Sequence, residues 1–209
     1  MANYTAQDVK ALRERSGAGM MDCKSALDEA DGNLDKAMEV LRLKGLKGVT
    51  KREGRTTSNG LIVARVNGGT GYLVELACET DFVAKASKFI ELADKVADAI
   101  AAAGATTLDA ALAAELGGKS VQDAINDEAA IMGEKVELRK VGSLKDAAVD
   151  AYMHRTSKDL PPQVGVLVAY SGADADTAHD VAVHIAAFSP SVLKREDVAA
   201  DVVATERRI

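Results

Sequence analysis

Two apolar segments separated by a short turn sequence constrain the fold of this chain most strongly. Residues 61–66 and 72–78 are rich in Leu, Val and Ala, and residues 67–70 between them read Asn-Gly-Gly-Thr, which tolerates positive φ. This pattern predicts a β-hairpin. A helix is expected next, from about residue 84 to residue 102, because its apolar residues recur on one face: Phe89, Leu92, Val96, Ala99 and Ile100.

The first 45 residues predict three short helices. Thr5 followed by Asp8 resembles a capping box, and Gly17 is placed to end the first helix. A second helix is expected over residues 21–30, and Asn33 is placed to cap a third. Helices this short must bury their apolar stripes against one another. We therefore expect residues 1–45 to form a UBA-like three-helix bundle that docks onto a partner.

Residues 46–59 lose this periodicity and combine glycines with Lys and Arg, which predicts a basic linker. Further along the chain, two more helices are expected after Thr107 and Ser120, and a strand is expected over residues 135–141.

The second half of the chain repeats part of the first. Residues 71–75 (GYLVE) are echoed by residues 165–169 (GVLVA), and residues 93–102 share six of ten residues with residues 178–187. The fold class expected is α+β, with small antiparallel sheets in two related subdomains. The predicted boundaries are residues 60–134 for the first subdomain and 135–198 for the second. Residues 199–209 are expected to begin a helix within which the sequence is truncated.

Composition excludes several classes of function. The hydrophobic content of 47% is enough for packed cores, yet no stretch reaches the ~18 apolar residues of a membrane span. The net charge of −6 argues against nucleic-acid binding. Cys23 and Cys78 lack metal-ligand spacing and are expected to be reduced and buried. We expect a cytoplasmic protein whose partner is another protein.

No catalytic centre is predicted. His179 and His184 are five residues apart, so they point in different directions on a helix and do not form a metal-binding pair. Residues 19–25 (GMMDCKS) contain Lys-Ser but lack the second glycine of a phosphate loop. We expect no catalytic residues, no metal, no cofactor and no small-molecule substrate.

Two segments place apolar side chains where folding alone does not require them. In residues 17–24 (GAGMMDCK), Met20 and Met21 lie at a turn between helices, and methionine adapts well to protein contacts. Either methionine could instead fill the core of the bundle. Phe82 lies within residues 80–85 (Thr-Asp-Phe-Val-Ala-Lys), between the end of a strand and the start of a helix, where its ring can point outward.

These two segments resemble the signature stretches of the bacterial elongation factor Ts family, the nucleotide-exchange factors for elongation factor Tu. Residues 5–15, Met132-Gly133-Glu134, residues 164–169 and residues 184–187 extend the similarity along the whole chain. The resemblance implies that the chain binds Tu in its GDP-bound and nucleotide-free forms. In this family the Phe of the Thr-Asp-Phe-Val turn enters between helices of the GTPase domain and disturbs the Mg²⁺ and phosphate site, so that GDP leaves.

The resemblance also implies roles for individual residues. Phe82 would be the wedge, Asp81 its polar neighbour, and Met132 would complete the apolar contact. Met20 and Met21 would contact the GTPase domain, and His154 would make a contact from the second subdomain. The partner-binding residues implied are Thr80, Asp81, Phe82, Val83, Met20, Met21, Met132 and His154.

The sequence also differs from the family at two places. Members continue into a helical hairpin and a closing strand beyond the position of Ile209, and residues 154–163 are longer than expected, which could displace His154. The alternative interpretation is a generic protein-binding module that uses the three-helix bundle, although this leaves the Phe82 segment unexplained. A Phe82 ring buried in its own core would contradict the main interpretation.

Overall fold

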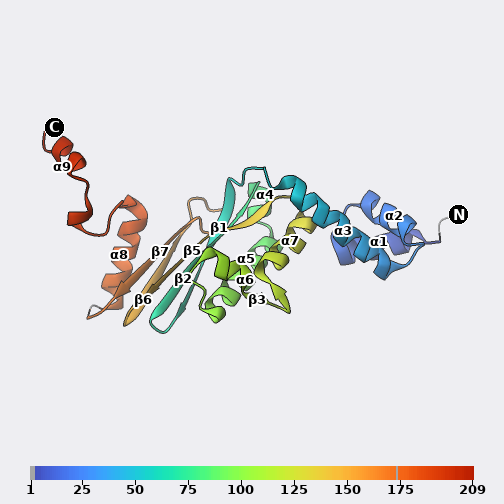
Figure 1. Ribbon diagram of the computed structural model, residues 1–209, viewed down its shortest axis with the longest axis horizontal. Helices are drawn as coiled ribbons and strands as arrows, with labels where there is room; N and C mark the ends of the chain where they lie inside the picture. Colours follow the sequence, from blue (N-terminus) through green and yellow to red (C-terminus); the bar gives the residue numbers. More distant parts are fainter. Residues whose placement is uncertain (1–2, 173) are drawn as a thin grey trace.

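A computed structural model describes residues 3–172 and 174–209 of the chain. Figure 1 shows an elongated molecule, with a group of helices at the N-terminal end, sheets and helices in the middle, and helices at the C-terminal end. Helices combined with small antiparallel sheets confirm the predicted α+β class. Within the two described ranges, no helix is both long enough and apolar enough to cross a bilayer.

The N-terminal group is the predicted bundle of three helices. These are α1 (Ala6–Ser16), α2 (Met20–Glu29) and α3 (Leu34–Arg52). The capping box is present, because Asp8 N–H donates to the Thr5 hydroxyl and Thr5 N–H donates to the Asp8 carboxylate. Residues from all three helices form a small separate core: Leu12, Cys23, Ala26, Leu27, Ala30 and Ala37.

Helix α3 is longer than the sequence suggested. Residues 46–52, which we assigned to a basic linker, continue the helix, and the irregular connection covers only residues 53–58. Glycine costs about 1 kcal/mol relative to alanine inside a helix, so Gly45 and Gly48 indicated a break. A Cβ atom on Gly45 would lie 2.6 Å from the Ala130 Cβ, so glycine allows α3 to lie directly against the helix that carries Ala130.

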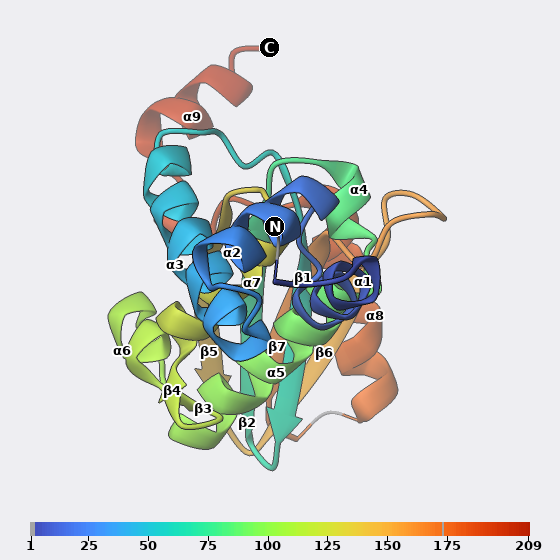
Figure 2. The same ribbon diagram turned by 90° about the vertical axis from the view of Figure 1, so that its right-hand side faces the viewer.

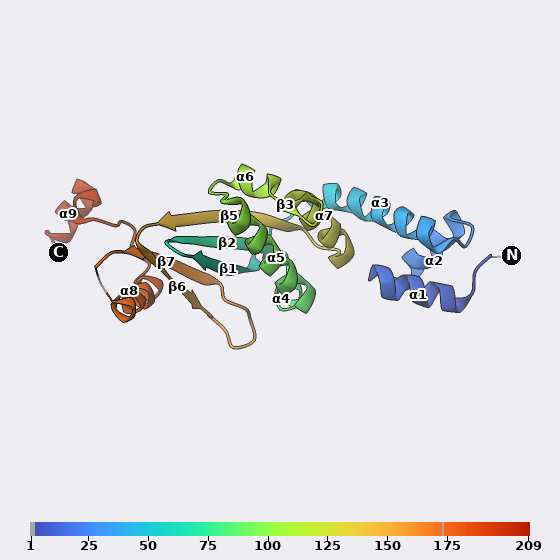
Figure 3. The same ribbon diagram turned by 90° about the horizontal axis from the view of Figure 1, so that it is seen from below.

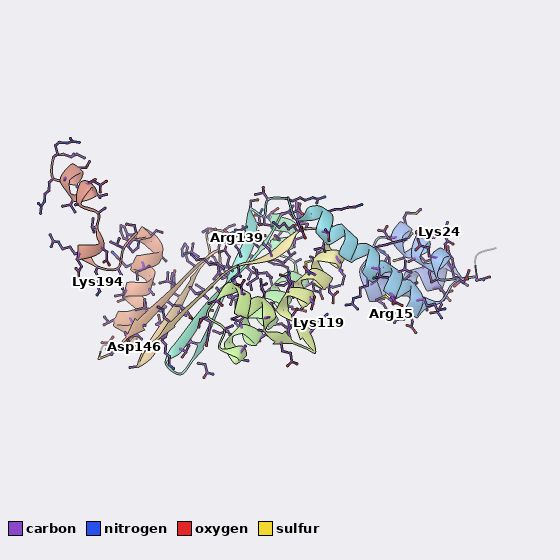
Figure 4. The ribbon with its side chains drawn as sticks, viewed as in Figure 1. Arg15, Lys24, Lys119, Arg139, Asp146 and Lys194 are labelled. Atoms are coloured by element: carbon purple, nitrogen blue, oxygen red, sulfur yellow. The ribbon has the colours of Figure 1, made fainter. Side chains whose placement is uncertain are left out.

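That helix is α7 (Val121–Met132), and charged side chains reinforce its contact with α3. The Asp127 carboxylate lies 3.2 Å from Arg42 Nε and 2.6 Å from Lys119 Nζ. Burial tends to raise the pKa of Asp127, but the hydrogen bonds and charges of Lys119 and Arg42 outweigh it and hold the pKa below its usual value. Figure 4 labels Lys119 on the core and Arg15 on the bundle, and both line a 290 Å³ depression at this junction.

The central sheet has three antiparallel strands in the order β1-β2-β5. These are β1 (Asn59–Asn67), β2 (Thr70–Cys78) and β5 (Val136–Lys145). The predicted hairpin is confirmed, with Gly68 and Gly69 as its loop. Because β5 pairs along the whole of β2, residues 136–145 extend the first sheet, whereas the predicted boundary at residue 135 placed them in the second subdomain.

Helices cover one face of this sheet. They are α5 (Ser87–Ala103), α6 (Leu108–Ala113) and α7, with a two-stranded ribbon of β3 (Glu115–Leu116) and β4 (Lys119–Ser120) between the last two. The caps predicted at Thr107 and Ser120 are confirmed. The helices and the sheet share a core that includes Phe89, Leu92, Val96, Ile100, Ile125, Val74 and Leu76.

A second hairpin packs on the opposite face of the sheet. It consists of β6 (Ala148–His154) and β7 (Val164–Tyr170), and α8 (Ala175–Phe188) packs on it in turn. A Cβ atom on Gly165 would lie 2.9 Å from side-chain atoms of Ile62 and Leu73, so this glycine permits the close approach of the two sheets. The echoed segments fall in corresponding elements, namely β2 with β7 and α5 with α8.

The C-terminal segment is the predicted short helical region. A 3₁₀ turn (Arg195–Asp197) precedes α9 (Ala200–Glu206), and both lie beyond α8 at the end of the molecule opposite the bundle (Figure 1).

Candidate functional site

A separate short helix carries the Thr-Asp-Phe-Val segment. The helix expected from residue 84 begins instead at Ser87, and α4 (Asp81–Ala84) precedes it. Thr80 is the N-cap of α4, and its hydroxyl accepts a hydrogen bond from Val83 N–H at 3.4 Å. Figure 2, which looks along the long axis, shows α4 at the rim of the molecule.

The side chains of α4 divide between core and solvent. Ala84 is fully buried and Val83 packs against the central core, so these two residues anchor the turn. Phe82 faces the other way and is 74% exposed. Burial of Ala84 and Val83 therefore leaves the largest apolar side chain of the turn in water.

A charged pair flanks the exposed ring. Lys85 Nζ lies 3.1 Å from the Asp81 carboxylate, one helical turn away, and 4.7 Å from the centre of the Phe82 ring. The ammonium group thus makes a cation–π contact with the ring while Asp81 holds it in place. Lys85 lies within the segment named from the sequence, but this role was not predicted, although its spacing of four from Asp81 was a usable signal.

The backbone just before α4 is fixed from the junction between α7 and β5. The Glu134 carboxylate accepts hydrogen bonds from Glu79 N–H at 3.1 Å, from Thr80 N–H at 3.0 Å and from the Thr80 hydroxyl. The Glu79 carboxylate in turn accepts from Lys135 N–H at 2.6 Å. We call this reciprocal pair of contacts the glutamate clasp. Sequence reasoning included Glu134 only within a matching motif, because nothing local indicates a partner so far along the chain.

Cys78 lies beneath the same turn. It is fully buried, its thiol donates to the Thr80 carbonyl oxygen at 3.3 Å, and it is a free thiol like the buried Cys23, as predicted. Burial and the nearby Glu134 carboxylate raise the pKa of Cys78 to about 12. Its role here is therefore to pack and to hold the turn, because a thiol with this pKa stays protonated near neutral pH.

Met20 and Met21, here called the methionine pair, occupy the first turn of α2 and are 62% and 74% exposed. The interpretation that one of them fills the core of the bundle is therefore wrong. Next to the pair lies a depression of 510 Å³ that is also lined by Tyr4, Val9, Lys10, Arg13 and Lys24. The bundle thus presents a second apolar surface with a basic rim.

Of the two remaining candidate residues, Met132 is half-buried and His154 is exposed. Met132 ends α7 half-buried, where it packs against the central core, so only part of its side chain is free for a partner. His154 is exposed at the end of β6, and its Nδ1 lies 3.1 Å from the Tyr152 hydroxyl. Figure 3 shows the loop that follows His154 on the same side of the molecule as α4.

The other two histidines lie on α8. His179 lies 3.1 Å from the Asp150 carboxylate, and His184 stacks on Phe188 with ring centres 4.5 Å apart. Among residues 3–172 and 174–209, no three metal-binding side chains form a group that could hold an ion. The surface that stands out is therefore the exposed aromatic ring of α4.

Comparison with known proteins gives the same family over the whole chain. The family model described as Elongation factor TS matches residues 79–209. This chain is also similar to three proteins named Elongation factor Ts. It is 58% identical to the one from Paenarthrobacter aurescens (strain TC1), and 59% identical to those from Arthrobacter sp. (strain FB24) and Kocuria rhizophila. Each alignment covers 100% of this chain and 76% of the relative. This chain belongs to the elongation factor Ts family.

Proposed function

We propose that this chain is a translation elongation factor that acts on elongation factor Tu as a guanine-nucleotide exchange factor in the cytoplasm. It binds Tu carrying GDP, promotes GDP release and leaves the nucleotide site open for GTP. It catalyses no covalent step itself, because exchange requires only a change in how tightly the partner holds its nucleotide. Family membership over the full chain supports this role and does not favour a generic binding module built on the bundle alone.

The observation that carries the proposal is the exposure of Phe82. A ring that is 74% exposed, on a short helix anchored by Val83 and Ala84, is arranged to enter an apolar gap in a partner. In the proposed mechanism Phe82 enters between helices of the GTPase domain and displaces the elements that hold Mg²⁺ and phosphate. Asp81 is the polar neighbour at the same helices, and Thr80 and Val83 hold the turn in shape.

Energetics requires a second contact. Shifting a partner from almost wholly closed to almost wholly open takes about 5.5 kcal/mol of differential binding. Full burial of one Phe contributes about 1.5–3 kcal/mol, so Phe82 alone is insufficient. The methionine pair and the exposed part of Met132 offer further apolar surface, and His154 is a polar candidate from the second hairpin. These contacts accelerate exchange only to the extent that they form better with the open partner than with the closed one.

The direct test is release of fluorescently labelled GDP from purified Tu, chased with excess unlabelled nucleotide. The intact chain should accelerate release, and it should act at substoichiometric amounts because GTP binding frees it for another cycle. The same amount of heat-unfolded chain is the matched control. Release that stays at the spontaneous rate, at any concentration of folded chain, would refute the proposed function.

A second arm of the experiment uses thermodynamic reciprocity. If the chain weakens GDP binding to Tu, then GDP with Mg²⁺ must weaken binding of the chain by the same factor. Titrations of Tu with the chain, with and without Mg²⁺·GDP, should therefore give different affinities. Equal affinities in both conditions would exclude exchange and leave a simple binding protein.

A further inference from the structure

The glutamate clasp joins two loops that are far apart in sequence. Glu134 follows Gly133, the left-handed cap at the end of α7, and it is half-buried against the residues that lead into α4. Its carboxylate accepts Glu79 N–H at 3.1 Å and Thr80 N–H at 3.0 Å on one oxygen, and the Thr80 hydroxyl on the other. A single side chain therefore receives three donors from two consecutive residues.

The N–H groups of Glu79 and Thr80 are not paired within the sheet. The ladder between β2 and its neighbours ends at Cys78, so the N–H groups of Glu79 and Thr80 lie past the last paired residue. Backbone N–H groups that are partly removed from water require a partner, and the Glu134 carboxylate supplies it. The clasp thereby fixes the direction in which the chain leaves the strand.

The same carboxylate sets the orientation of the N-cap. The Thr80 hydroxyl donates its proton to Glu134, so its lone pairs are free to accept from Val83 N–H, which begins α4. A helix of four residues does not persist on its own, because nucleation is costly and few hydrogen bonds follow it. The shape of α4, and with it the direction of Phe82, therefore depends on contacts from outside the helix.

The opposite half of the clasp closes the arrangement. The Glu79 carboxylate accepts a hydrogen bond from Lys135 N–H at 2.6 Å and lies 3.2 Å from Arg55 Nη1. Glu79 therefore stabilises the α7–β5 junction, while its own backbone N–H donates to Glu134. Each loop thus supplies a carboxylate to the backbone of the other. Loss of one glutamate leaves backbone donors of the partner loop unsatisfied.

We propose that Glu134 is a positioning residue for nucleotide exchange, which acts by holding the α4 turn in the conformation that presents Phe82. The inference rests on the proposed function, and Glu134 itself need not touch the partner. It predicts that Glu134 matters for exchange only while Phe82 is present. It also predicts that the acceptor geometry of the side chain matters more than its charge.

Three substitutions separate geometry from charge. Glu134→Gln keeps one oxygen that can accept both backbone N–H groups, and its NH2 group can donate to the Thr80 hydroxyl where Glu134 accepted from it, so exchange should stay within about twofold of wild type. Glu134→Asp is one methylene shorter and does not reach the turn, and Glu134→Ala removes the acceptors. Both should slow GDP release at saturating chain by about tenfold, a loss that corresponds to one or two hydrogen bonds. Glu91→Ala, which removes an exposed glutamate on α5, is the matched control and should have no effect.

The decisive measurement is a double-mutant cycle. In the Phe82→Ala background, Glu134→Ala should cause no further slowing, because a positioning residue has nothing left to position. Amide hydrogen exchange adds a readout that does not depend on Tu: protection of the Glu79, Thr80 and Val83 amides should fall in Glu134→Ala and Glu134→Asp and persist in Glu134→Gln. The chain concentration at half-maximal rate should change less than the maximal rate.

The outcomes are distinguishable. If wild-type chain does not accelerate GDP release, the proposed function fails. If wild type is active and Phe82→Ala is slow, but Glu134→Ala exchanges as fast as wild type, the positioning role alone fails. Slowing by Glu134→Ala that adds fully to that of Phe82→Ala also overturns the inference. Should Glu134→Ala not fold, the contrast between Glu134→Gln and Glu134→Asp decides the same question, and equal rates in those two variants contradict it.

Discussion

Removal of the Phe82 ring gives the sharpest prediction from this structure. Complete burial of a Phe side chain is worth about 1.5–3 kcal/mol, and 74% of this residue is available for a partner to cover. Phe82→Ala should therefore cost about 1–2 kcal/mol of the interaction that opens Tu, and at 1.36 kcal/mol per factor of ten this slows GDP release by about 5- to 30-fold. Stability should change by less than about 0.5 kcal/mol, because the ring makes few contacts within its own chain.

The assay is stopped-flow release of fluorescent GDP from Tu over a range of chain concentrations. Phe188→Ala is the matched control, because Phe188 is 72% exposed and its loss removes a similar apolar surface from α8, a helix that lies apart from α4 in Figures 1 and 3. Release should slow with Phe82→Ala and remain at the wild-type rate with Phe188→Ala, while urea unfolding shows both variants folded. Wild-type release with Phe82→Ala, or equal slowing by both variants, would refute the assignment of the wedge.

Three further outcomes follow from features away from the ring. Replacing both members of the methionine pair with alanine should weaken binding to Tu by about 30-fold, which corresponds to about 2 kcal/mol of lost apolar burial. The urea midpoint should not change, because both side chains are exposed. Unchanged affinity would show that the pair is not part of the interface. Gly45→Ala should destabilise the chain by about 1–3 kcal/mol in urea unfolding, because the new Cβ overlaps Ala130, and Ala130→Gly should restore part of this loss; no destabilisation would mean that α3 does not pack as described. The hydrogen bond from Lys135 N–H holds the pKa of Glu79 below its usual 4.5, against the opposing effect of burial and with a contribution from Arg55. Since the pKa is lower in the folded chain, this stabilisation is complete above about pH 4.5 and is lost as the pH falls through the folded value, so Glu79→Gln should flatten the acid limb of a stability–pH curve.

Local signals made much of the fold predictable. The capping box at Thr5 and the turn glycines at residues 68 and 69 act over a few residues, so the first helix and the hairpin could be predicted with their approximate limits. The outward direction of Phe82 also followed from its place between a strand and a helix. In each case the sequence neighbours that decide the structure lie within one turn.

The errors came from contacts between distant segments. Gly45 reads as a helix breaker, but its contact with Ala130 on α7 stabilises the continuous helix. Likewise, β5 pairs with β2 although residues 79–135 separate the two strands in the sequence. The periodicity within residues 136–145 does not indicate which strand lies alongside.

In the candidate site, too, the contiguous motif could be predicted from the sequence, whereas the contacts with distant residues could not. Thr80, Asp81, Phe82 and Val83 could be named from the sequence because they form one contiguous motif. The hydrogen bonds from Glu79 and Thr80 to Glu134 could not, because a carboxylate acceptor is chosen by proximity in space. Met132 was named because it lies in a motif shared with the family, but its partial burial against the central core could not be predicted from that motif.

The unbroken course of α3 has a mechanical consequence. If a flexible tether joined the bundle to the rest of the chain, the methionine pair and Phe82 would bind the partner in two separate steps. A stiff helical arm instead sets the spacing between them in advance, so one docking event delivers both. Each residue added to such an arm rotates the bundle by about 100° and moves it by about 1.5 Å, so a one-residue insertion in α3 just before Gly45, where α3 packs on Ala130 of α7, would turn the methionine pair relative to Phe82.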